Sequence, residues 1–394
     1  MSFVGAAPDV AEIAARTRAF VREVCLPAEE RFPGPDLDPA LRAEVQAAAR
    51  EAGVFAPHVP AEFGGVGLDI RGWSAVFEEA GYSLLGPQAL NCAAPDEGNM
   101  HLLEVVATEA QKERYLRPLA AGEIRSCFAM TEPHPGAGSD PAALATRARR
   151  ADGGWVIEGS KRFISGADGA AFSICMARAD EGATMFLIDA SNPGWQVGRR
   201  MQTTDTVFAG GHSEVEIRDC RVGADAVLGE VGQGFRYAQV RLGPARLTHC
   251  MRWLGLARRA MDVALDRAAE RSVFGSRLEE LGLAQGLIAD SVIDIEASRS
   301  LIRWAAEVLD SGAHGRHETS VAKVFVAEAV WRVIDRSLQL TGGDGVTDGL
   351  PLARFQNEVR PFRIYDGPSE THRWAIARRA SRVRAAERER DVRS

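Results

Sequence analysis

The chain has 394 residues, of which 46% are hydrophobic, and this is enough for a large buried core in two or three domains. The formal net charge is −7 and the basic residues form no block, which argues against a nucleic-acid partner. No apolar run approaches the ~18 residues that a membrane span needs. The six scattered cysteines include no CxxC pair, as in proteins with reduced thiols. We therefore expect a soluble, cytoplasmic protein.

Three successive patterns along the chain predict a multi-domain α+β fold that is mainly α-helical. Residues 1–126 repeat apolar side chains at helical spacing and predict an N-terminal α-helical domain. Residues 127–240 hold short β-type runs between turn clusters, and they predict an antiparallel β-barrel or sandwich as the middle domain. Residues 241–394 contain long helical patterns with one apolar face and predict a C-terminal four-helix bundle.

Several common catalytic signatures are absent from the sequence. There is no GxxxxGK[ST] loop, no GxGxxG turn between a strand and a helix, and no GxSxG nucleophile elbow. His314 and His317 form an HxxH pair, but no further ligand cluster accompanies them. We therefore predict a solvated loop there and no metal site.

The run CFAMTEPHPGAGSD, residues 127–140, stands where the helical pattern changes to the β-type pattern. Its small-residue loop would expose backbone N–H groups, and Thr131 and Ser139 add hydroxyls. Such groups can hold the edge of a planar heterocycle or a pyrophosphate. From the residues alone, a plain interdomain linker with turn residues explains the run equally well.

The stretch from Gln339 to Glu370 combines a glycine-dense turn with a single acidic residue before a Gly-Pro break. Gly342 and Gly343 would let the backbone approach a ligand, or would simply end a helix. Asp366 has aromatic and apolar neighbours, and a carboxylate in such a partly dry place can act as a base. The alternative is that Asp366 only caps a helix or a turn.

These motifs, taken in order, resemble those of the acyl-CoA dehydrogenase family, and the resemblance covers about Val10 to Arg379. TEP…GAGSD and GSKRFISG are similar to the two flavin-binding segments of the family. RSVFG resembles R-x-x-F-G, QLTGGDG resembles Q-x-x-GG-x-G, and IYDGPSE stands in the place of the Y-E-G-T base motif. A closer resemblance is to the branch of family members 10 and 11, through the runs Asn91–Met100, Gly122–Pro133 and Arg241–Arg252.

The resemblance implies FAD as the cofactor. In the family an aromatic residue packs on the isoalloxazine and a hydroxyl bonds its N5 side, which implies Phe163 and Ser165. Arg271 and Gln339 would reach the FAD of a neighbouring subunit. The full set of implied FAD-binding residues is Phe128, Met130, Thr131, Gly138, Ser139, Phe163, Ser165, Arg271, Phe274, Gln339, Gly342, Gly343, Pro368 and Glu370.

The resemblance also implies the reaction, an α,β-dehydrogenation of an acyl-CoA thioester. Asp366 would remove the α-proton while the β-hydrogen leaves as hydride to flavin N5, and the Asp366 backbone N–H would bond the thioester carbonyl. A second base position known in some members is Ala245 here, so Asp366 stands alone in the role. The implied substrate-binding residues are Ser139, Arg246 and Gly367, although Arg246 is equally compatible with a buried ion pair.

Four departures from the family pattern accompany these assignments. Asp366 is one methylene shorter than the usual Glu, and Pro368 replaces a Thr that bonds the flavin. The flavin loop carries two extra residues at 134–135, and the D-x-x-R motif associated with CoA keeps only its Arg because Gly243 replaces the Asp.

The resemblance further implies a homodimer or, as a dimer of dimers, a homotetramer built through the C-terminal bundle. It implies fatty acid metabolism with an electron-transfer flavoprotein as electron acceptor. Two alternatives stay open: a nitroalkane-oxidase-like enzyme, in which an Asp also serves as base, and a non-catalytic assembly protein that binds flavin or CoA. The use of a 4-hydroxyacyl-CoA, as in the animal branch with its kinase-like domain, also stays open.

Overall fold

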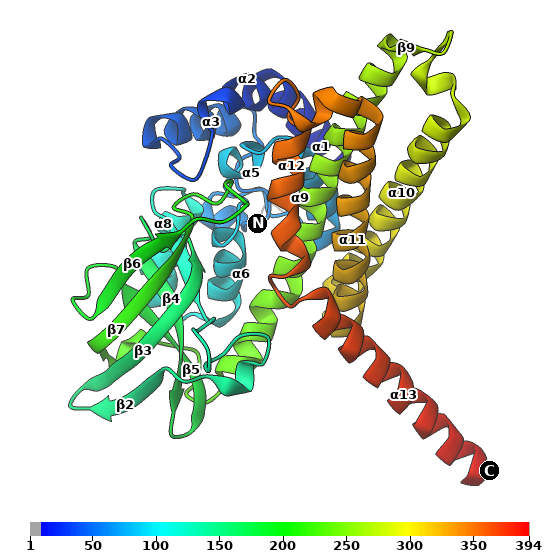
Figure 1. Cartoon of the computed structure of the whole chain (residues 1–394). Coiled ribbons are helices and arrows are strands. Elements are labelled where there is room, and N and C mark those ends of the chain that lie inside the picture. The colour runs from blue at the N-terminus through cyan, green and yellow to red at the C-terminus, as the bar shows by residue number, and fades with distance from the viewer. Residues whose placement is uncertain (1–8, 394) are drawn as a thin grey trace, which may run out of the picture. The chain divides into compact units, whose positions relative to one another are not determined.

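The computed structural model describes residues 9–393, which form two compact units that divide after Ala245. The first unit contains a set of helices followed by a β-sheet, and the second consists almost entirely of helices (Figure 1). The mainly helical α+β architecture predicted from the sequence is confirmed.

The first unit begins with helices that carry recognisable start signals. Asp9 accepts hydrogen bonds from the N–H groups of Ala11 and Glu12, and Asp69 accepts one from Gly72, so each caps a helix N-terminus. The helices and helical turns are α1 Val10–Phe20, η1 Val21–Cys25, α2 Leu26–Ala28, η2 Glu29–Arg31, α3 Pro39–Glu51, η3 Ala61–Phe63, α4 Ile70–Ala80, α5 Gly86–Ala89, α6 Asp96–Val106, α7 Glu109–Gln111, η4 Lys112–Leu116 and α8 Arg117–Ala120.

The rest of the first unit is an eight-stranded sheet with the order β6-β7-β3-β2-β4-β5-β8, in which β1 pairs with β4. Most neighbours are antiparallel as predicted, but β1 and β2 pair with β4 in parallel. Buried aliphatic and aromatic side chains of the strands, including Trp155, Phe186 and Trp195, form its core. The elements are β1 Ser126–Ala129, η5 Pro141–Ala143, β2 Arg147–Ala151, β3 Gly154–Ser165, β4 Phe172–Ala179, β5 Gly182–Asp189, β6 Trp195–Met201, β7 His212–Gly223, η6 Ala224–Ala226 and β8 Val227–Leu228.

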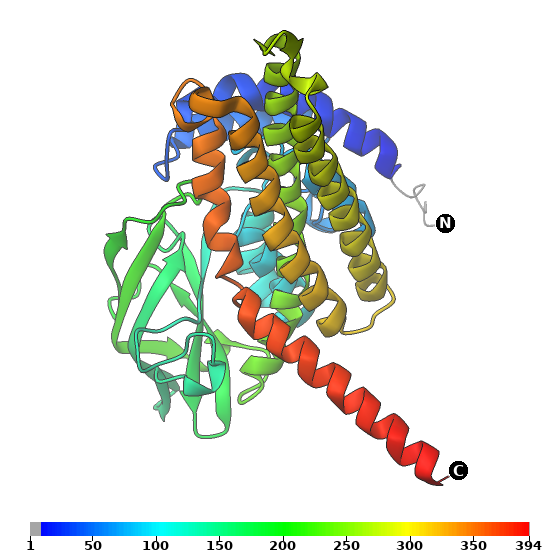
Figure 2. The same cartoon turned by 45° about the vertical axis from the view of Figure 1, so that its right-hand side comes forward.

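Long helices build the second unit, and α10 and α11 run side by side in both views (Figures 1 and 2). Asp294 of α10 binds Arg332 and Arg336 of α11, which ties this pair of helices together. Helix α9, Gly234–Glu270, begins in the first unit and continues into the second. The remaining elements are β9 Ser272–Val273, β10 Ser276–Arg277, η7 Leu278–Glu280, α10 Gly282–Asp310, α11 Arg316–Thr341, η8 Gly342–Val346, α12 Leu352–Val359, η9 Arg360–Arg363 and α13 Ser369–Arg393.

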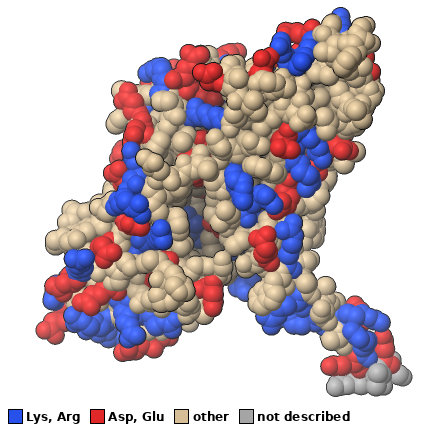
Figure 3. All heavy atoms as spheres, in the orientation of Figure 1, with Lys and Arg blue, Asp and Glu red and all other residues tan. Residues whose placement is uncertain are grey.

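Charged side chains of both signs lie on the surface, and the cysteines lie in the interior. Acidic and basic side chains are interspersed on the face drawn in Figure 3. All six cysteines are buried, and each is a free thiol. Within residues 9–393, every helix is too short or too polar to cross a membrane.

Candidate functional site

Glu132 fixes the loop that follows β1. Its Oε1 accepts hydrogen bonds from Lys161 Nζ at 2.9 Å and Thr146 N at 2.9 Å, and its Oε2 accepts from Ala137 N at 3.0 Å and Ala145 N at 2.6 Å. Burial raises the pKa of Glu132, but the Lys161 ammonium and the donated hydrogen bonds outweigh it and lower that pKa to about 2. The loop is therefore fixed in place by hydrogen bonds to a buried, ionised carboxylate.

Phe163 is held in a strained, exposed conformation beside this loop. Its φ is 59° and its side chain is 52% exposed, both unusual for an aromatic residue in a strand. A register shift in the pairing of β3 with β7 interrupts the strand here, and Arg162 N donates to Thr131 O at 2.9 Å. A side chain added at the exposed Gly138 would meet no atom within 4 Å. The structure thus offers an exposed aromatic face, hydroxyls on Thr131 and Ser165, and open space.

Three further residues expected to bind flavin, Phe128, Met130 and Ser139, lie on β1 or in the loop that follows it. Phe128 is half-buried, with the guanidinium carbon of Arg241 lying 4.2 Å from its ring centroid. The carbonyl of Met130 accepts a hydrogen bond from Lys161 Nζ at 3.3 Å, and Ser139 is exposed. Phe128 and Met130 therefore connect the loop to the rest of the unit, while Ser139 faces outward.

The second unit brings together two motifs that lie about 70 residues apart in the sequence. Arg271 and Gln339 are both exposed, and a Cβ at Gly342 would lie 3.0 Å from Arg271 Nη1. Phe274 forms the tip of the β9–β10 hairpin, with a φ of 50° and 97% exposure. Gly343 is exposed and has no atom within 4 Å of its would-be side chain. The Arg271 guanidinium therefore lies beside the glycine turn that follows α11, and Gln339, Phe274 and Gly343 are exposed in the same two segments.

Asp366 also has a left-handed backbone conformation, with a φ of 54°. Its Oδ2 is buried, lies 3.4 Å from His249 Nε2, and accepts no hydrogen bond from the described residues. An Asp that capped a helix would accept a backbone hydrogen bond with its side chain, so the structure does not support the capping interpretation. One oxygen of the Asp366 carboxylate, Oδ2, therefore accepts no hydrogen bond from the described residues.

Three side chains from three helices hold the peptide that follows Asp366. Arg246 Nε on α9 and His372 Nε2 on α13 both lie 3.0 Å from the Asp366 carbonyl oxygen, to which they donate. Lys323 Nζ on α11 donates to the Gly367 carbonyl at 2.7 Å. Because each donor comes from a packed helix, the base candidate sits on a backbone with little freedom to move.

The residues after Asp366 complete this arrangement. Gly367 has a φ of 95°, and a side chain there would come within 2.6 Å of His372 Nε2, so only glycine fits. Pro368 precedes α13, and Glu370 is exposed in its first turn. Gly367 is therefore a structural requirement of the segment, whatever else its backbone does.

Burial lowers the pKa values of the three side chains that hold residues 366–367. Burial lowers the pKa of Lys323 to about 8, although Asp366 opposes the shift, and burial lowers the pKa of Arg246 as well. Burial and then the Arg246 charge lower the pKa of His372 to about 4. Near neutral pH His372 is therefore uncharged, with Nε2–H donating to Asp366 and Nδ1 facing the Ser320 hydroxyl at 3.1 Å.

His249 is a residue of this site that the motif assignments did not single out. Its Nδ1 lies 3.2 Å from Arg252 Nη2, a donor, so Nδ1 accepts and Nε2 carries the hydrogen that faces Asp366. The Tyr365 hydroxyl, which accepts from Trp253 Nε1 at 2.6 Å, packs beside the imidazole. The signal was present in the run from Arg241 to Arg252, which contains His249.

The low pKa of His372 predicts a loss of stability in acid. The unfolded chain binds a proton at the ordinary imidazole pKa of 6.5, and the folded chain does so only at about 4. Stability is therefore fully present above pH 6.5 and is lost as the pH falls toward 4, by about 2 kcal/mol between pH 7 and 5. In urea unfolding at these two pH values, we expect His372→Gln to lose less stability than the wild type. Equal losses would show that His372 does not titrate as described.

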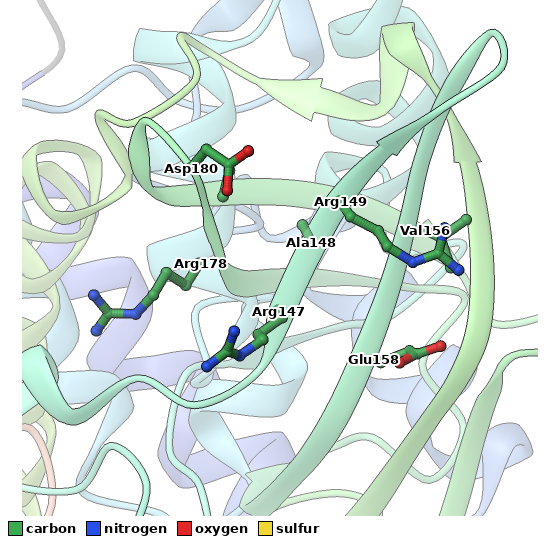
Figure 4. Close-up of a pocket in the computed structure, with 8 residues that line it drawn as sticks. Arg147, Ala148, Arg149, Val156, Glu158, Arg178 and Asp180 are labelled. Atoms are coloured by element: carbon green, nitrogen blue, oxygen red, sulfur yellow. The ribbon is translucent and has the colours of Figure 1, made fainter.

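A separate cavity of about 260 Å³ lies on the sheet (Figure 4). None of the residues expected to bind flavin or substrate lines it. Within the described part of the chain, no group of three or more His, Cys, Asp or Glu residues could hold a metal ion. The cavity is lined by Arg147, Ala148, Arg149, Val156, Glu158, Arg178, Ala179 and Asp180.

Three family models match successive parts of the chain. The acyl-CoA dehydrogenase N-terminal domain matches residues 7–123, the middle domain matches 127–220 and the C-terminal domain matches 232–381. Together these matches take in most of the chain.

Individual proteins agree with the family models. "Probable acyl-CoA dehydrogenase FadE2" of Mycobacterium tuberculosis is 38% identical over 88% of this chain and 87% of its own length. Acyl-CoA dehydrogenase family member 11 of Rattus norvegicus is 34% identical over 93% of this chain, which spans only 50% of that longer protein. Glutaryl-CoA dehydrogenase of Mycobacterium smegmatis, solved in complex with FADH2, has a TM-score of 0.85 and 25% identity over 94% of each chain.

Proposed function

Because this chain belongs to the acyl-CoA dehydrogenase family, we propose that it is an FAD-dependent enzyme that oxidises the α,β-bond of an acyl-CoA thioester, with Asp366 as the base. The observation that carries the proposal is the buried Oδ2 of Asp366, which accepts no hydrogen bond from the described residues and stands on a backbone held from three helices. When bound, FAD would supply the acceptor for the β-hydrogen.

The residues of the first unit fit a flavin. Phe163 offers an exposed aromatic face at a strained φ, which a planar ring system would cover. Thr131 and Ser165 supply hydroxyls, and open space lies beside Gly138. We assign the flavin ring to this surface, and we assign Arg271, Gln339 and Gly342 to the diphosphate of an FAD bound by a neighbouring subunit.

Asp366 has the two groups that proton removal needs. Its carboxylate would accept the α-proton. Because that proton is too weakly acidic for a free carboxylate to remove, a second group must make it more acidic. Its backbone N–H donates to no described residue and is available to the thioester carbonyl, whose developing charge it would stabilise. The left-handed φ and the fixed carbonyls set the position of the shorter Asp side chain. His249 Nε2–H, at 3.4 Å, helps to orient the carboxylate.

An anaerobic titration tests the proposal. The purified protein should contain FAD, and its flavin absorbance should bleach with at least one member of a panel of saturated acyl-CoA thioesters that vary in chain length and head group. Protein that holds FAD but is reduced by no thioester would contradict the assigned reaction, and protein that holds no flavin would contradict the cofactor.

The Asp at position 366 favours one second candidate, a nitroalkane oxidase-like activity, because an Asp serves as base in those enzymes of the same superfamily. That enzyme would form hydrogen peroxide from nitroalkanes in air and would ignore acyl-CoA. The two candidates therefore differ in the substrate that reduces the flavin.

We also propose that the second unit forms the contacts of a homodimer or homotetramer, and that an electron-transfer flavoprotein reoxidises the enzyme. Large apolar side chains are exposed on α10 and on the β9–β10 hairpin, including Leu283 at 91%, Ile293 at 64% and Phe274 at 97%. Exposed apolar side chains of this size favour burial by another chain. Sedimentation analysis would establish the oligomeric state.

Arg271→Gln should weaken FAD binding. Removing a cation that hydrogen-bonds a phosphate costs about 1.5–3 kcal/mol, so we expect the Kd for FAD to rise by about 10- to 100-fold. The measurement is FAD release during dilution, followed by fluorescence. Arg277→Gln, on the same hairpin and exposed, is the matched control and should release FAD like the wild type. Unchanged retention in Arg271→Gln would remove this residue from the cofactor site.

A further inference from the structure

Ser165, His212 and Asp205 form a hydrogen-bonded row inside the first unit. The Ser165 Oγ lies 2.8 Å from His212 Nδ1, and His212 Nε2 lies 3.1 Å from Asp205 Oδ2. Ser165 at the end of β3 pairs directly with His212 at the start of β7, so the two side chains share one face of the sheet. The Ser165–His212 contact therefore follows from strand register, whereas Asp205 comes from the segment that connects β6 to β7.

The inner end of this row is buried and charged. Asp205 is 6% exposed; burial raises its pKa, but the hydrogen bond and charge of His212 outweigh this and hold it below its usual range. Asp205 is therefore ionised and accepts Nε2–H. Among the charged groups of neighbouring segments, Arg200 on β6 pairs with Asp36 and lies 3.8 Å from Asp168, and Arg125 donates to the Ala209 carbonyl. Phe208 packs against the imidazole ring.

Given this geometry, the charge of His212 determines the direction of the Ser165 hydroxyl hydrogen. When His212 is neutral, Nε2 carries its hydrogen toward Asp205, and the bare Nδ1 accepts the Ser165 O–H. The outer side of Ser165 Oγ then offers only lone pairs. When His212 is protonated, Nδ1–H donates to Ser165 Oγ, and the hydroxyl hydrogen is free to point outward.

We propose that His212, anchored by Asp205, is a positioning residue that switches Ser165 between donor and acceptor toward the flavin. The proposal rests on the proposed function, which assigns the flavin ring to this surface, and on the family resemblance, which implies that the Ser165 hydroxyl bonds the N5 side of the ring. A flavin N5 is a hydrogen-bond acceptor when oxidised and carries a hydrogen when reduced. Oxidised flavin therefore favours protonated His212, and reduced flavin favours neutral His212.

The proton balance follows from this preference. In the pH range where His212 is protonated beside oxidised flavin and neutral beside reduced flavin, reduction releases the Nδ1 proton of His212. The protein then takes up one proton fewer from solvent for each pair of electrons. The flavin potential should consequently change less steeply with pH in this range than it would with a residue that does not titrate.

The same three residue types also occur in acyl-transfer enzymes, but the surroundings of Ser165 differ. The backbone N–H of Gly166, next to Ser165, already donates to the Gly211 carbonyl at 2.9 Å. It is therefore not available to stabilise an oxyanion beside the hydroxyl. The row is better suited to orienting a hydrogen bond than to nucleophilic attack.

The test compares the reduction potential of bound FAD between pH 5.5 and 9 in the full-length flavoprotein. The variant is His212→Asn, whose amide can still face Ser165 but cannot titrate. We expect a shallower dependence on pH in the wild type than in His212→Asn, and Asp205→Asn should move the shallow range to lower pH. His314→Asn, an exposed histidine in the second unit, is the control and should follow the wild type.

Each outcome separates this proposal from the proposed function. Parallel potential–pH curves for the wild type and His212→Asn, both with FAD bound and both reduced by acyl-CoA, would overturn the switch and leave the dehydrogenase intact. A wild-type protein without FAD would instead contradict the proposed function. In case His212→Asn fails to fold, Ser165→Ala removes only the hydroxyl and should abolish the shallow range in the same way.

Discussion

Asp366→Asn is expected to reduce the rate of flavin reduction by acyl-CoA by a factor on the order of 10³, because a positioned general base contributes about 10²–10⁴-fold. The amide keeps the size of the side chain, and the Asp366 carbonyl keeps its bonds to Arg246 and His372. FAD content and thermal stability should therefore stay close to the wild-type values. Stopped-flow reduction under anaerobic conditions measures the effect.

The matched control for this variant is Asp348→Asn, which changes an exposed Asp in a turn of the same unit. It should be reduced at the wild-type rate. If Asp366→Asn were reduced as fast as this control, another residue would have to remove the α-proton.

Arg246→Lys is expected to lower the maximal rate of flavin reduction by about 10²-fold, since a misplacement of about 1 Å at a reacting group can have that effect. Arg246 Nε donates to the Asp366 carbonyl, and a lysine ammonium cannot reproduce that planar donor geometry. Because the Arg acts here through the base segment, the maximal rate should fall with little change in the half-saturating concentration of acyl-CoA.

The sequence left Arg246 open between a CoA contact and a buried ion pair, and this variant distinguishes a CoA contact from a positioning role. A rise in half-saturation without a lower maximal rate would assign Arg246 to CoA binding. Arg303→Lys, on the exposed side of α10, controls for the substitution itself and should have no effect.

Much of the fold was predictable because it depends on local periodicity. The long apolar stripes predicted the bundle, and short runs between turns predicted the sheet. The parallel pairing of β1 with β4 was not predictable, because strand partners far apart in sequence leave no local pattern. The segment around Asp366 could be located from its motif, but the left-handed backbone conformation of Asp366 could not.

The neighbours of the candidate site were the least predictable part. Lys323 comes from a helix whose sequence shows only apolar spacing, and His372 comes from a helix rich in charged residues. Both are buried, with their polar atoms on the carbonyls of residues 366–367. His212 stands on a strand with alternating polarity and gave no sign of its pairing with Ser165. Such contacts arise from the packing of distant elements, which no single stretch of sequence records.

The most direct test of the central claim measures proton removal alone. An acyl-CoA analogue with sulfur in place of the β-carbon has no β-hydrogen to transfer, so its α-hydrogens can exchange with solvent without oxidation. In D2O the wild-type flavoprotein should exchange an α-hydrogen of the bound analogue, and Asp366→Asn should exchange it at least about 10²-fold more slowly. Equal exchange rates in the two proteins would contradict the assignment of Asp366 as the base.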